Sequence, residues 1–510
     1  MRYLLGIDIG TSGTKSVLFD QEGQAVASSL REYPLYQPQN GWAEQDPDDW
    51  WNAVVCSCQD IVKESSVDPV EIVGVGLSGQ MHGLVMLDED HRVIRRAIIW
   101  CDQRTGEECE QITELVGRER LLEISANPAL TGFTASKILW VRNHEPERYA
   151  RCRKILLPKD YIRYRLTGEF ATEVSDASGM QLLDVKNRCW SQEILDKLDI
   201  KIDLLGKVYE SPEVTGRVTP EASDVTGLAV GTFVVGGAGD NAASAVWMGI
   251  VENGLAFASI GTSGVVYAHT SKMRFDPKGR VHTFCCAVPG EWHVMGVTQA
   301  AGLSLQWFRN NFCAEEVQEA HEKGLDPYEL MTDAASKSPI GSNQLIYLPY
   351  LMGERTPHLN PDCRGVFFGL SASHTRADLT RAIMEGVSYS LFDCVRILRE
   401  MDVAFDEIMA CGGGGKSALW RSMMADIFNY PINTIGSYSG PTLGVAILAG
   451  VGVGVYPSVK DACQLIINKN QGVAPKAQNH KKYMEFYSLY CDLYPDLLDG
   501  YKTLAEIRKN

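Results

Sequence analysis

The sequence has few of the features that mark an exported or membrane-bound protein. The N-terminal segment, MRYLLGIDIG, is apolar for only a few residues before it reaches Asp8, so we expect no signal peptide. The longest apolar stretch, residues 443–456, is too short and too rich in glycine to span a bilayer. We therefore expect a soluble protein without a membrane partner.

Cysteine is also sparse, with 14 residues in a chain of 510. No two cysteines have the CxxC spacing of a metal site or redox motif, and pairs such as Cys285 and Cys286 are too close for an ordinary disulfide. Free thiols are typical of a reducing compartment. The cytoplasm is the expected location.

Positive charge is in deficit, because 48 Lys and Arg residues face 64 Asp and Glu residues, a net charge of −16. Nucleic-acid binding needs basic stripes that neutralise phosphates, so a nucleic-acid partner is not expected. A small anionic cofactor remains compatible with this charge, because a few lysines and oriented amides form a local positive site.

A short repeat is the most informative internal feature. Residues 8–13 (DIGTSG) recur as residues 259–264 (SIGTSG), and apolar runs typical of strands flank both copies. Each copy therefore predicts a strand, a glycine-rich turn and a second strand. We interpret the chain as a duplication with two domains, residues 1–247 and 248–510.

Helical and strand patterns alternate along the chain. Apolar residues at helical spacing predict helices at Pro47–Val62, Ala377–Arg399 and Ala418–Phe428. The first should begin with Asp46 as its N-cap and Pro47 in its first turn. Buried strands are predicted at Ile72–Leu77, Thr232–Val235, Leu345–Leu348 and Ile408–Cys411. The mixture indicates an α/β fold.

The first copy of the repeat carries groups that suit phosphate. Its glycines let backbone amides point at phosphate oxygens, while Thr11, Ser12 and Lys15 add hydroxyl donors and a positive charge. Asp8, at the strand end, is placed to hold Mg²⁺ through water. An ordinary hairpin is the alternative, because Asp and Gly also form turns. The second copy, which contains Gly261 and Thr262, favours the hypothesis that two loops bind one polyphosphate.

Residues 234–243 (VVGGAGDNAA) place Asp240 on a glycine-rich turn at the start of a helix. The match to a dinucleotide-binding pattern is weak, because an acid stands where phosphate approaches the helix. An acid there is able to accept a proton from a substrate hydroxyl while helix amides keep it ionised. A helix N-cap is the alternative role.

Two more segments offer binding surfaces. Residues 411–417 (CGGGGKS) resemble the end of a P-loop, but the first required glycine is replaced by Ala410. Four glycines before a helix still offer flat backbone for a nucleotide base or ribose. Residues 79–83 (GQMHG) follow a strand and place His82 where it is able to bind sugar hydroxyls, or where it only supports its loop. Trp100 offers an aromatic wall nearby or belongs to the core.

Two long segments carry a family resemblance. Gly132–His144 (GFTASKILWVRNH) and Gly365–Gly386 (GVFFGLSASHTRADLTRAIMEG) resemble the two signatures of the FGGY carbohydrate kinases. Shorter segments add to the resemblance, namely SGQMHGLV, WAEQDPDDWW, LLPKDYIRYRLTGE, GDNAASAV and LPYLMGERTPH. The resemblance extends from the first hairpin to the helix after GGGGKSALW.

The resemblance implies two actin-like, ribonuclease-H-like domains around a central cleft, with ATP and Mg²⁺ as cofactors. It implies that Asp240 is the general base and that Asp8 is the acid beside Mg²⁺ and the transferred phosphoryl group. The implied phosphate contacts are Thr11, Ser12, Lys15, Gly261 and Thr262; the adenosine contacts are Gly413, Gly414 and Ser417; and the sugar contacts are Met81, His82, Asp240 and Asn241.

The most specific expectation concerns the sugar that accepts the phosphoryl group. Glycerol kinases carry an Arg-Glu pair at the position of Met81-His82, so this chain departs from a glycerol site. Gluconate kinases also carry Met-His there, usually followed by Ser rather than Gly83. The expected acceptor is a small ketose, D-xylulose; ribulose, gluconate or a related polyol stays open. An actin-like or chaperone-like ATPase is the alternative from another class, and a homodimer stays open.

Overall fold

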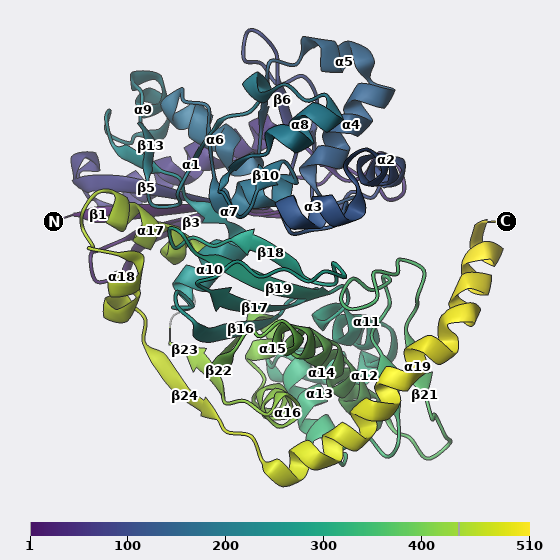
Figure 1. Cartoon of the computed structure of the whole chain (residues 1–510). Coiled ribbons are helices and arrows are strands. Elements are labelled where there is room, and N and C mark those ends of the chain that lie inside the picture. The colour runs from purple at the N-terminus through teal and green to yellow at the C-terminus, as the bar shows by residue number, and fades with distance from the viewer. Residues whose placement is uncertain (1, 437–438, 510) are drawn as a thin grey trace.

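The structure, a computed structural model, describes residues 2–436 and 439–509. Two mixed β-sheets, each accompanied by helices, organise the chain (Figure 1). The first sheet has the order β13 (Val214–Arg217), β14 (Phe233–Val235), β5 (Ile72–Gly79), β1 (Tyr3–Ile9), β2 (Gly13–Phe19) and β3 (Ala25–Glu32), with β15 (Ala238–Gly239) also on β5. The second has the order β18 (His282–Cys285), β19 (Trp292–Thr298), β17 (Gly264–Thr270), β16 (Gly254–Ile260), β22 (Phe405–Cys411), β23 (Ile432–Ile435) and β24 (Lys469–Val473).

The two copies of the repeat form the two predicted hairpins. Strands β1 and β2 pair antiparallel around one turn, and β16 and β17 pair antiparallel around the other. The first strand of each hairpin also pairs in parallel with a later strand, β1 with β5 and β16 with β22. The glycine-rich turns therefore occupy equivalent places in the two sheets.

The helices predicted from apolar spacing are confirmed as α1 (Pro47–Ser65), α14 (Arg376–Glu400) and α16 (Ala418–Phe428). Helix α1 begins as expected, because the Asp46 side chain accepts from the backbone N–H of Asp48 and Pro47 follows the cap. The four predicted strands are confirmed as β5, β14, β20 (Ile346–Leu348) and β22.

Further helices surround the sheets (Figure 1). They are α2 (Gly106–Val116), α3 (Arg118–Ser125), α4 (Thr134–His144), α5 (Pro146–Arg151), α6 (Pro158–Thr167), α7 (Val174–Ala177), α8 (Gln192–Leu198), α9 (Pro220–Thr226), α10 (Asp240–Trp247), α11 (Gly302–Phe312), α12 (Ala314–Lys323), α13 (Pro327–Ser336), α15 (Gly412–Gly415), α17 (Pro441–Gly452), α18 (Val459–Ile466) and α19 (Ala477–Lys509). Short 3-10 turns η1 (Pro69–Glu71), η2 (Ser178–Met180) and η3 (Ile202–Leu204) join some of them. Short strand pairs complete the chain: β4 (Glu44–Gln45) with β7 (Ala97–Ile98), β6 (Val85–Leu87) with β8 (Lys154–Leu156), β9 (Ala171–Glu173) with β12 (Lys207–Tyr209), β10 (Leu183–Asp184) with β11 (Cys189–Trp190), and β20 with β21 (Val366–Phe368).

Helix α17 returns from the second half of the chain to the first sheet. Glycines allow its close approach: a Cβ added to Gly6 on β1 would lie 2.0 Å from the Thr442 carbonyl oxygen, and one added to Gly76 on β5 would lie 1.9 Å from that of Val445. The expected domain boundary follows α10 (Asp240–Trp247), yet α17 lies beyond it in sequence and on the first sheet in space. The apolar stretch 443–456 thus contributes a buried helix.

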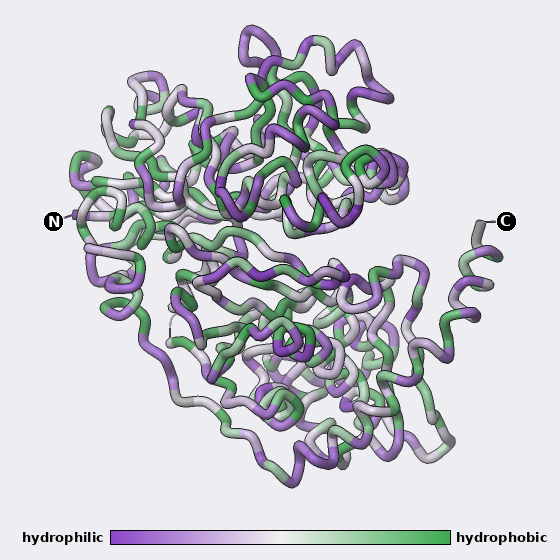
Figure 2. The backbone as a smooth tube through the Cα atoms, in the orientation of Figure 1, coloured by the Kyte–Doolittle hydropathy of each residue, from purple (hydrophilic) through white to green (hydrophobic). Residues whose placement is uncertain are grey.

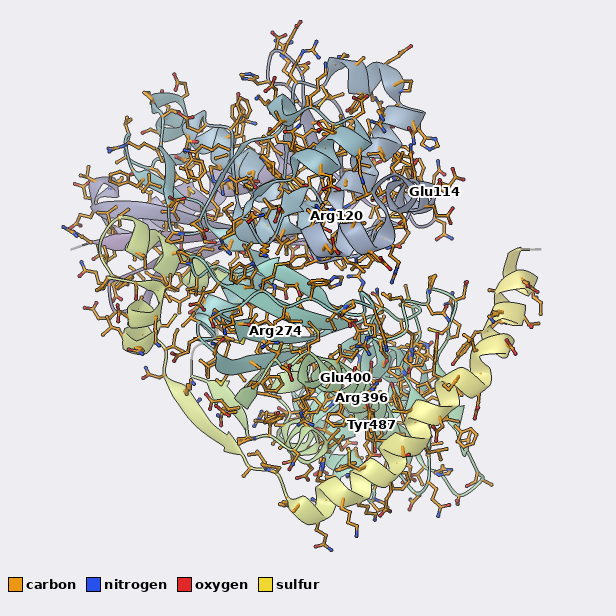
Figure 3. All side chains as sticks on the ribbon, in the orientation of Figure 1. Glu114, Arg120, Arg274, Arg396, Glu400 and Tyr487 are labelled. Carbon is orange, nitrogen blue, oxygen red and sulfur yellow. The ribbon has the colours of Figure 1, made fainter. Side chains whose placement is uncertain are left out.

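Apolar segments concentrate on the strands and on the helices that cover them, whereas many peripheral turns are hydrophilic (Figure 2). The long helix α19 is held against α14 by polar contacts. The Tyr487 hydroxyl donates to Asp393 Oδ1 at 2.6 Å, and Arg396, which pairs with Glu400, donates to the Tyr487 oxygen at 3.2 Å (Figure 3). Among the described residues, no helix is long and apolar enough to cross a membrane. The cysteines are free thiols, as expected.

Candidate active site

Three parallel strand ends bring the first group of predicted residues together. Asp8 on β1 is in register with Ser78 on β5, and Ser78 is in register with Ala238 on β15. Asp240 follows β15 directly as the first residue of α10. Since the carboxyl ends of parallel strands meet at one edge of a sheet, Asp8 and Asp240 share that edge.

Asp240 has the environment of a base that works near neutral pH. Its Oδ1 accepts from the Asn241 backbone N–H at 2.7 Å and from Asn241 Nδ2 at 2.9 Å. Burial, followed by the charge of Asp8, raises the pKa of Asp240 to about 7 against these two bonds. The N-cap of α10 is Gly239, so the structure does not use Asp240 as the cap. Its carboxylate is therefore free of that structural role.

Asp8 fits the expected metal-binding position. Its Oδ1 is buried and has no hydrogen-bond partner among the residues that the structure describes. Burial raises the pKa of Asp8, and Ser78 and the Lys15 charge oppose that shift. No cluster of three or more His, Cys, Asp or Glu side chains suited to a metal occurs in the described parts of the chain. One carboxylate with an unused oxygen still fits Mg²⁺, which is commonly held by one or two carboxylates plus phosphates and water.

The loop after β5 presents a neutral histidine. His82 has a left-handed backbone (φ 68°), and its Nδ1 lies 2.9 Å from the Gly179 carbonyl oxygen. Since a carbonyl only accepts, Nδ1 carries the proton and Nε2 is left as an acceptor. Burial, followed by the charge of Lys137, lowers the pKa of His82 to about 3. The ring stacks on Phe133 with centroids 4.5 Å apart, which fixes its orientation.

Met81 is buried between the loop and the turn before Asp240. A Cβ added to Gly239 would lie 2.9 Å from Met81 Cγ, so glycine at 239 makes room for the thioether. The side chain is 6% exposed. The structure thus places Met81, His82, Asp240 and Asn241 around one region.

The first hairpin turn is tied to the same region. Trp100 Nε1 donates to Thr11 Oγ1 at 2.9 Å, and Gln45 Nε2 donates to the Thr11 carbonyl at 2.7 Å. Trp100 is 39% exposed, so it lies on the loop surface and not in the core. Ser12 is exposed, and the positive charge of Lys15 acts on Asp8. The groups predicted to bind phosphate therefore border Asp8.

The second group of predicted residues lines a cavity of about 430 Å³ in the second half of the chain. Its walls include two expected phosphate contacts, Gly261 and Thr262, and the three expected adenosine contacts, Gly413, Gly414 and Ser417. The glycine run forms the single helical turn α15 and not extended backbone. Ser417 also caps α16, accepting from the Trp420 backbone N–H at 3.3 Å. Apolar walls with a few polar groups are typical of a small-molecule site.

Sequence reasoning assigned no role to two residues that border the site. Arg355, from the second half, is close enough that its charge helps to lower the pKa of His82. Glu354 supports its segment by accepting from Thr298 Oγ1 at 2.6 Å and from the Gln299 N–H at 2.9 Å. The only sequence signal was the segment LPYLMGERTPH, in which no spacing singles out Arg355.

Ring contacts connect the loop of Met81 and His82 to the second half of the chain. His82 and Phe133 lie with ring centroids 6.2 Å and 6.0 Å from Phe284 on β18. Asn127 Nδ2 donates to the Thr283 carbonyl at 3.0 Å, close to the same strand contacts. The first group of site residues is therefore packed against the second sheet.

Two family models match most of the chain. The model of the N-terminal domain of the FGGY family of carbohydrate kinases matches residues 3–247, and the model of the C-terminal domain of that family matches residues 256–453.

Individual proteins match over their full length. A xylulose kinase of Bacillus subtilis is 39% identical over 510 residues, covering 100% of both chains. A gluconokinase of Bacillus licheniformis is 32% identical, covering 100% of this chain and 98% of its own. The crystal structure described as a xyloylose kinase from Brucella ovis has a TM-score of 0.89 and 35% identity, covering 98% of this chain and 100% of its own.

Proposed function

Because the chain belongs to the FGGY family of carbohydrate kinases, we propose that it transfers the γ-phosphoryl group of ATP to D-xylulose and forms D-xylulose 5-phosphate. The observation that carries the reaction type is Asp240, a carboxylate with a pKa of about 7 beside a second acid, at the edge where three strands end. The similarity to xylulose kinases over the whole chain supports the choice of sugar.

In this mechanism, Asp240 orients the primary hydroxyl of the sugar and accepts its proton. Asn241 engages Oδ1, which leaves Oδ2 for the substrate. The sugar oxygen attacks the γ-phosphorus, the bond to the bridging β,γ-oxygen breaks, and ADP leaves. Such transfer depends mainly on positioning and on stabilising charge. A base with a pKa near 7 is ionised often enough at neutral pH and still holds the proton it receives.

The phosphate groups are assigned to the two hairpin turns. Thr11, Ser12 and Lys15 lie on the hairpin that begins with the strand of Asp8, and Gly261 with Thr262 offers exposed backbone on the second hairpin. When bound, Mg²⁺ neutralises phosphate charge, and Asp8 is the residue that would hold it. The adenosine is assigned to the cavity wall formed by Gly413, Gly414 and Ser417.

The sugar is assigned to the loop of Met81 and His82. The unprotonated Nε2 of His82 accepts from a sugar hydroxyl, while Met81 packs against the carbon skeleton. Glycine is required at position 83 by the local packing, because a Cβ there would lie 2.5 Å from Pro158 Cγ. A serine here, as in gluconate kinases, would therefore require Pro158 or the loop to move.

A substrate panel tests the proposal. The purified chain is supplied with ATP and MgCl₂, and ADP release is followed with D-xylulose, D-ribulose, D-gluconate, glycerol or no sugar. We expect the highest kcat/KM with D-xylulose. A higher value with gluconate would support the second candidate, which the 32% identical gluconokinase favours. A rate of ADP release that is the same with every sugar and without sugar would instead indicate an ATPase. Removal of metal with EDTA, followed by addition of Mg²⁺, tests whether the reaction depends on this metal. A homodimer and a cytoplasmic location stay predictions.

A further inference from the structure

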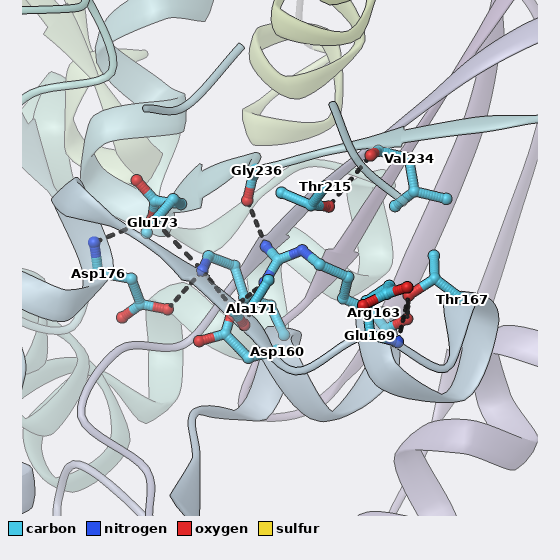
Figure 4. Close-up of polar contacts among 12 residues, drawn as sticks. Asp160, Arg163, Thr167, Glu169, Ala171, Glu173, Asp176, Thr215, Val234 and Gly236 are labelled. Carbon is cyan, nitrogen blue, oxygen red and sulfur yellow. Dashed lines mark hydrogen bonds and ion pairs between the residues drawn. The ribbon is translucent and has the colours of Figure 1, made fainter. Parts of the chain in front are cut away.

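A buried cluster of charges lies behind the proposed base. Lys159 Nζ lies 2.9 Å from Asp160 Oδ1, 3.3 Å from Glu173 Oε1 and 3.1 Å from Asp176 Oδ2 (Figure 4). Arg163 pairs with Asp160 as well. These five side chains are at most 1% exposed. Burying charge is costly and ion pairs often only offset that cost, so stability alone is a weak reason for such a cluster.

The cluster holds the turn that precedes Asp240. Arg163 Nη2 donates to the Gly236 carbonyl oxygen (Figure 4). The Gly239 backbone N–H donates to Ser175 Oγ at 3.1 Å. Hydrogen bonds therefore hold the turn at Gly236, its first residue, and at Gly239, its last residue. Asp240 is the next residue along the chain.

Ser175 is itself fixed by Glu173. Its Oγ donates to Glu173 Oε1 at 2.9 Å, and its backbone N–H donates to Glu173 Oε2 at 2.7 Å. A hydroxyl has one hydrogen, so once it points at Glu173 only lone pairs face the Gly239 N–H. The Glu173 carboxylate thus determines that Ser175 Oγ accepts from the Gly239 N–H. Lys159 pairs with this carboxylate.

Two positive side chains meet three acids in the cluster. Burial raises the pKa of Asp176 despite its contact with Lys159, which favours the neutral acid. Lys159 contacts Asp160 and Glu173, and Arg163 contacts Asp160. The Lys159 ammonium therefore lies beside the carboxylate that accepts from Ser175 Oγ.

We propose that Ser175, oriented by Glu173, is a positioning residue that sets where the Asp240 carboxylate meets the sugar hydroxyl. This inference rests on the proposed function and deepens it. A shift of about 1 Å in a reacting group costs on the order of 100-fold in rate, so loss of one anchoring bond should lower kcat. It should leave substrate binding largely intact, because Ser175 contacts neither substrate in the proposed mechanism.

The test compares two serines of the same buried segment. Ser175 accepts from the Gly239 N–H at 3.1 Å, whereas Ser178 accepts from the Cys285 N–H at 3.0 Å and not from the turn. Both side chains are 0% exposed. Ser178→Ala is thus a matched control that removes the same kind of bond. We measure kcat, both KM values, the pH profile of kcat and Tm for wild type, Ser175→Ala and Ser178→Ala.

For Ser175→Ala we expect kcat to fall about 10-fold or more, with each KM within about twofold of wild type and the midpoint of the pH profile displaced. Ser178→Ala should lose a similar amount of Tm and keep its kcat. Equal kcat in the two variants would overturn the inference. Ser175→Cys fills the same space with a weak acceptor and should repeat the kcat loss if the alanine variant does not fold. Wild type without D-xylulose activity would instead refute the proposed function.

Discussion

Asp8 and Asp240 are two acids held at the ends of β1 and β15, which both pair with β5, and the charge of Asp8 adds to burial in raising the pKa of Asp240 to about 7. The charge of Asp8 resists ionisation of Asp240, because like charges in a site with little water repel strongly. The pair therefore has two roles available: one acid that stays ionised beside a cation, and one that exchanges a proton near neutral pH.

The first prediction is a pH profile. Because Asp240 must be unprotonated to accept a proton, kcat/KM for the sugar should rise with pH and level off above about 7. The measurement is initial rates from about pH 5 to pH 9 with saturating ATP and metal. A midpoint near the ordinary aspartate value of about 4 would contradict the raised pKa.

The second prediction concerns Asp240→Asn. Loss of the general base should lower kcat by about 10²–10⁴-fold, while ATP binding is retained. The folded pKa of Asp240 lies above its unfolded value, so its contribution to stability is present at low pH and is lost as pH rises through about 7. Asparagine does not ionise, so the variant does not lose this stability as pH rises. Its Tm should therefore exceed that of wild type at about pH 8, and the difference should shrink towards about pH 4.

Near-normal turnover in the folded variant would remove Asp240 from the mechanism. Asp224→Asn is the control, since this acid is exposed on α9. It should leave kcat unchanged.

The sequence predicted those parts of the site that depend on local pattern. The repeat predicted both hairpins, and glycine-rich turns at strand ends predicted the positions of Asp8, Asp240 and His82. These features require only neighbouring residues, because a strand followed by glycines and a polar group already determines a loop at a sheet edge.

The supporting cluster could not be predicted in the same way. Residues 158–167 (PKDYIRYRLT) carry several charges, a composition typical of an exposed helix. Lys159 and Arg163 are buried because Glu173 and the Gly236 carbonyl come to them from elsewhere in the chain. Arg355 is similar, since only tertiary packing brings it near His82. Long-range pairing of buried charges leaves no periodic signal in the sequence.

The third prediction distinguishes the two copies of the repeat. Asp8 is in register with Lys15 on the paired strand, whereas its counterpart Ser259 is in register with Val265. Only the first copy therefore has an acid and a lysine. Asp8→Ala should lower kcat by about 100-fold or more at saturating Mg²⁺, while Ser259→Ala should stay within about tenfold of wild type. A larger loss from Ser259→Ala would reverse these roles.

The fourth prediction concerns the nucleotide cavity. A Cβ on Gly413 would find its nearest neighbour, the Ile260 carbonyl oxygen, at 4.0 Å, so Gly413→Ala should fold normally. Because Gly413 lines the cavity, the added methyl should raise the ATP KM by roughly 3- to 10-fold, up to about 1.4 kcal/mol. The sugar KM should not change. Gly500→Ala, in a helix with open space around it, is the matched control and should leave both KM values alone. An unchanged ATP KM would place the nucleotide elsewhere.

The last prediction concerns the acceptor. His82→Ala removes the Nε2 acceptor and leaves sugar hydroxyls without a partner, so kcat/KM for the sugar should fall about 10- to 100-fold, or about 1–3 kcal/mol. The ATP KM should change little. The variant also loses the bond to Gly179 and puts alanine in a left-handed backbone, both of which lower stability.

His91→Ala separates these effects, because His91 is also left-handed (φ 60°) and bonds through Nδ1 to the Tyr164 hydroxyl at 2.9 Å. It lies on an exposed turn after β6, away from Asp240. Both variants should lose some Tm, but only His82→Ala should lose sugar kcat/KM. If the two variants lose Tm equally and His82→Ala keeps its sugar KM and kcat, His82 only supports its loop. The acceptor would then be recognised by other groups, and the assignment of D-xylulose would lose the support that it draws from this loop.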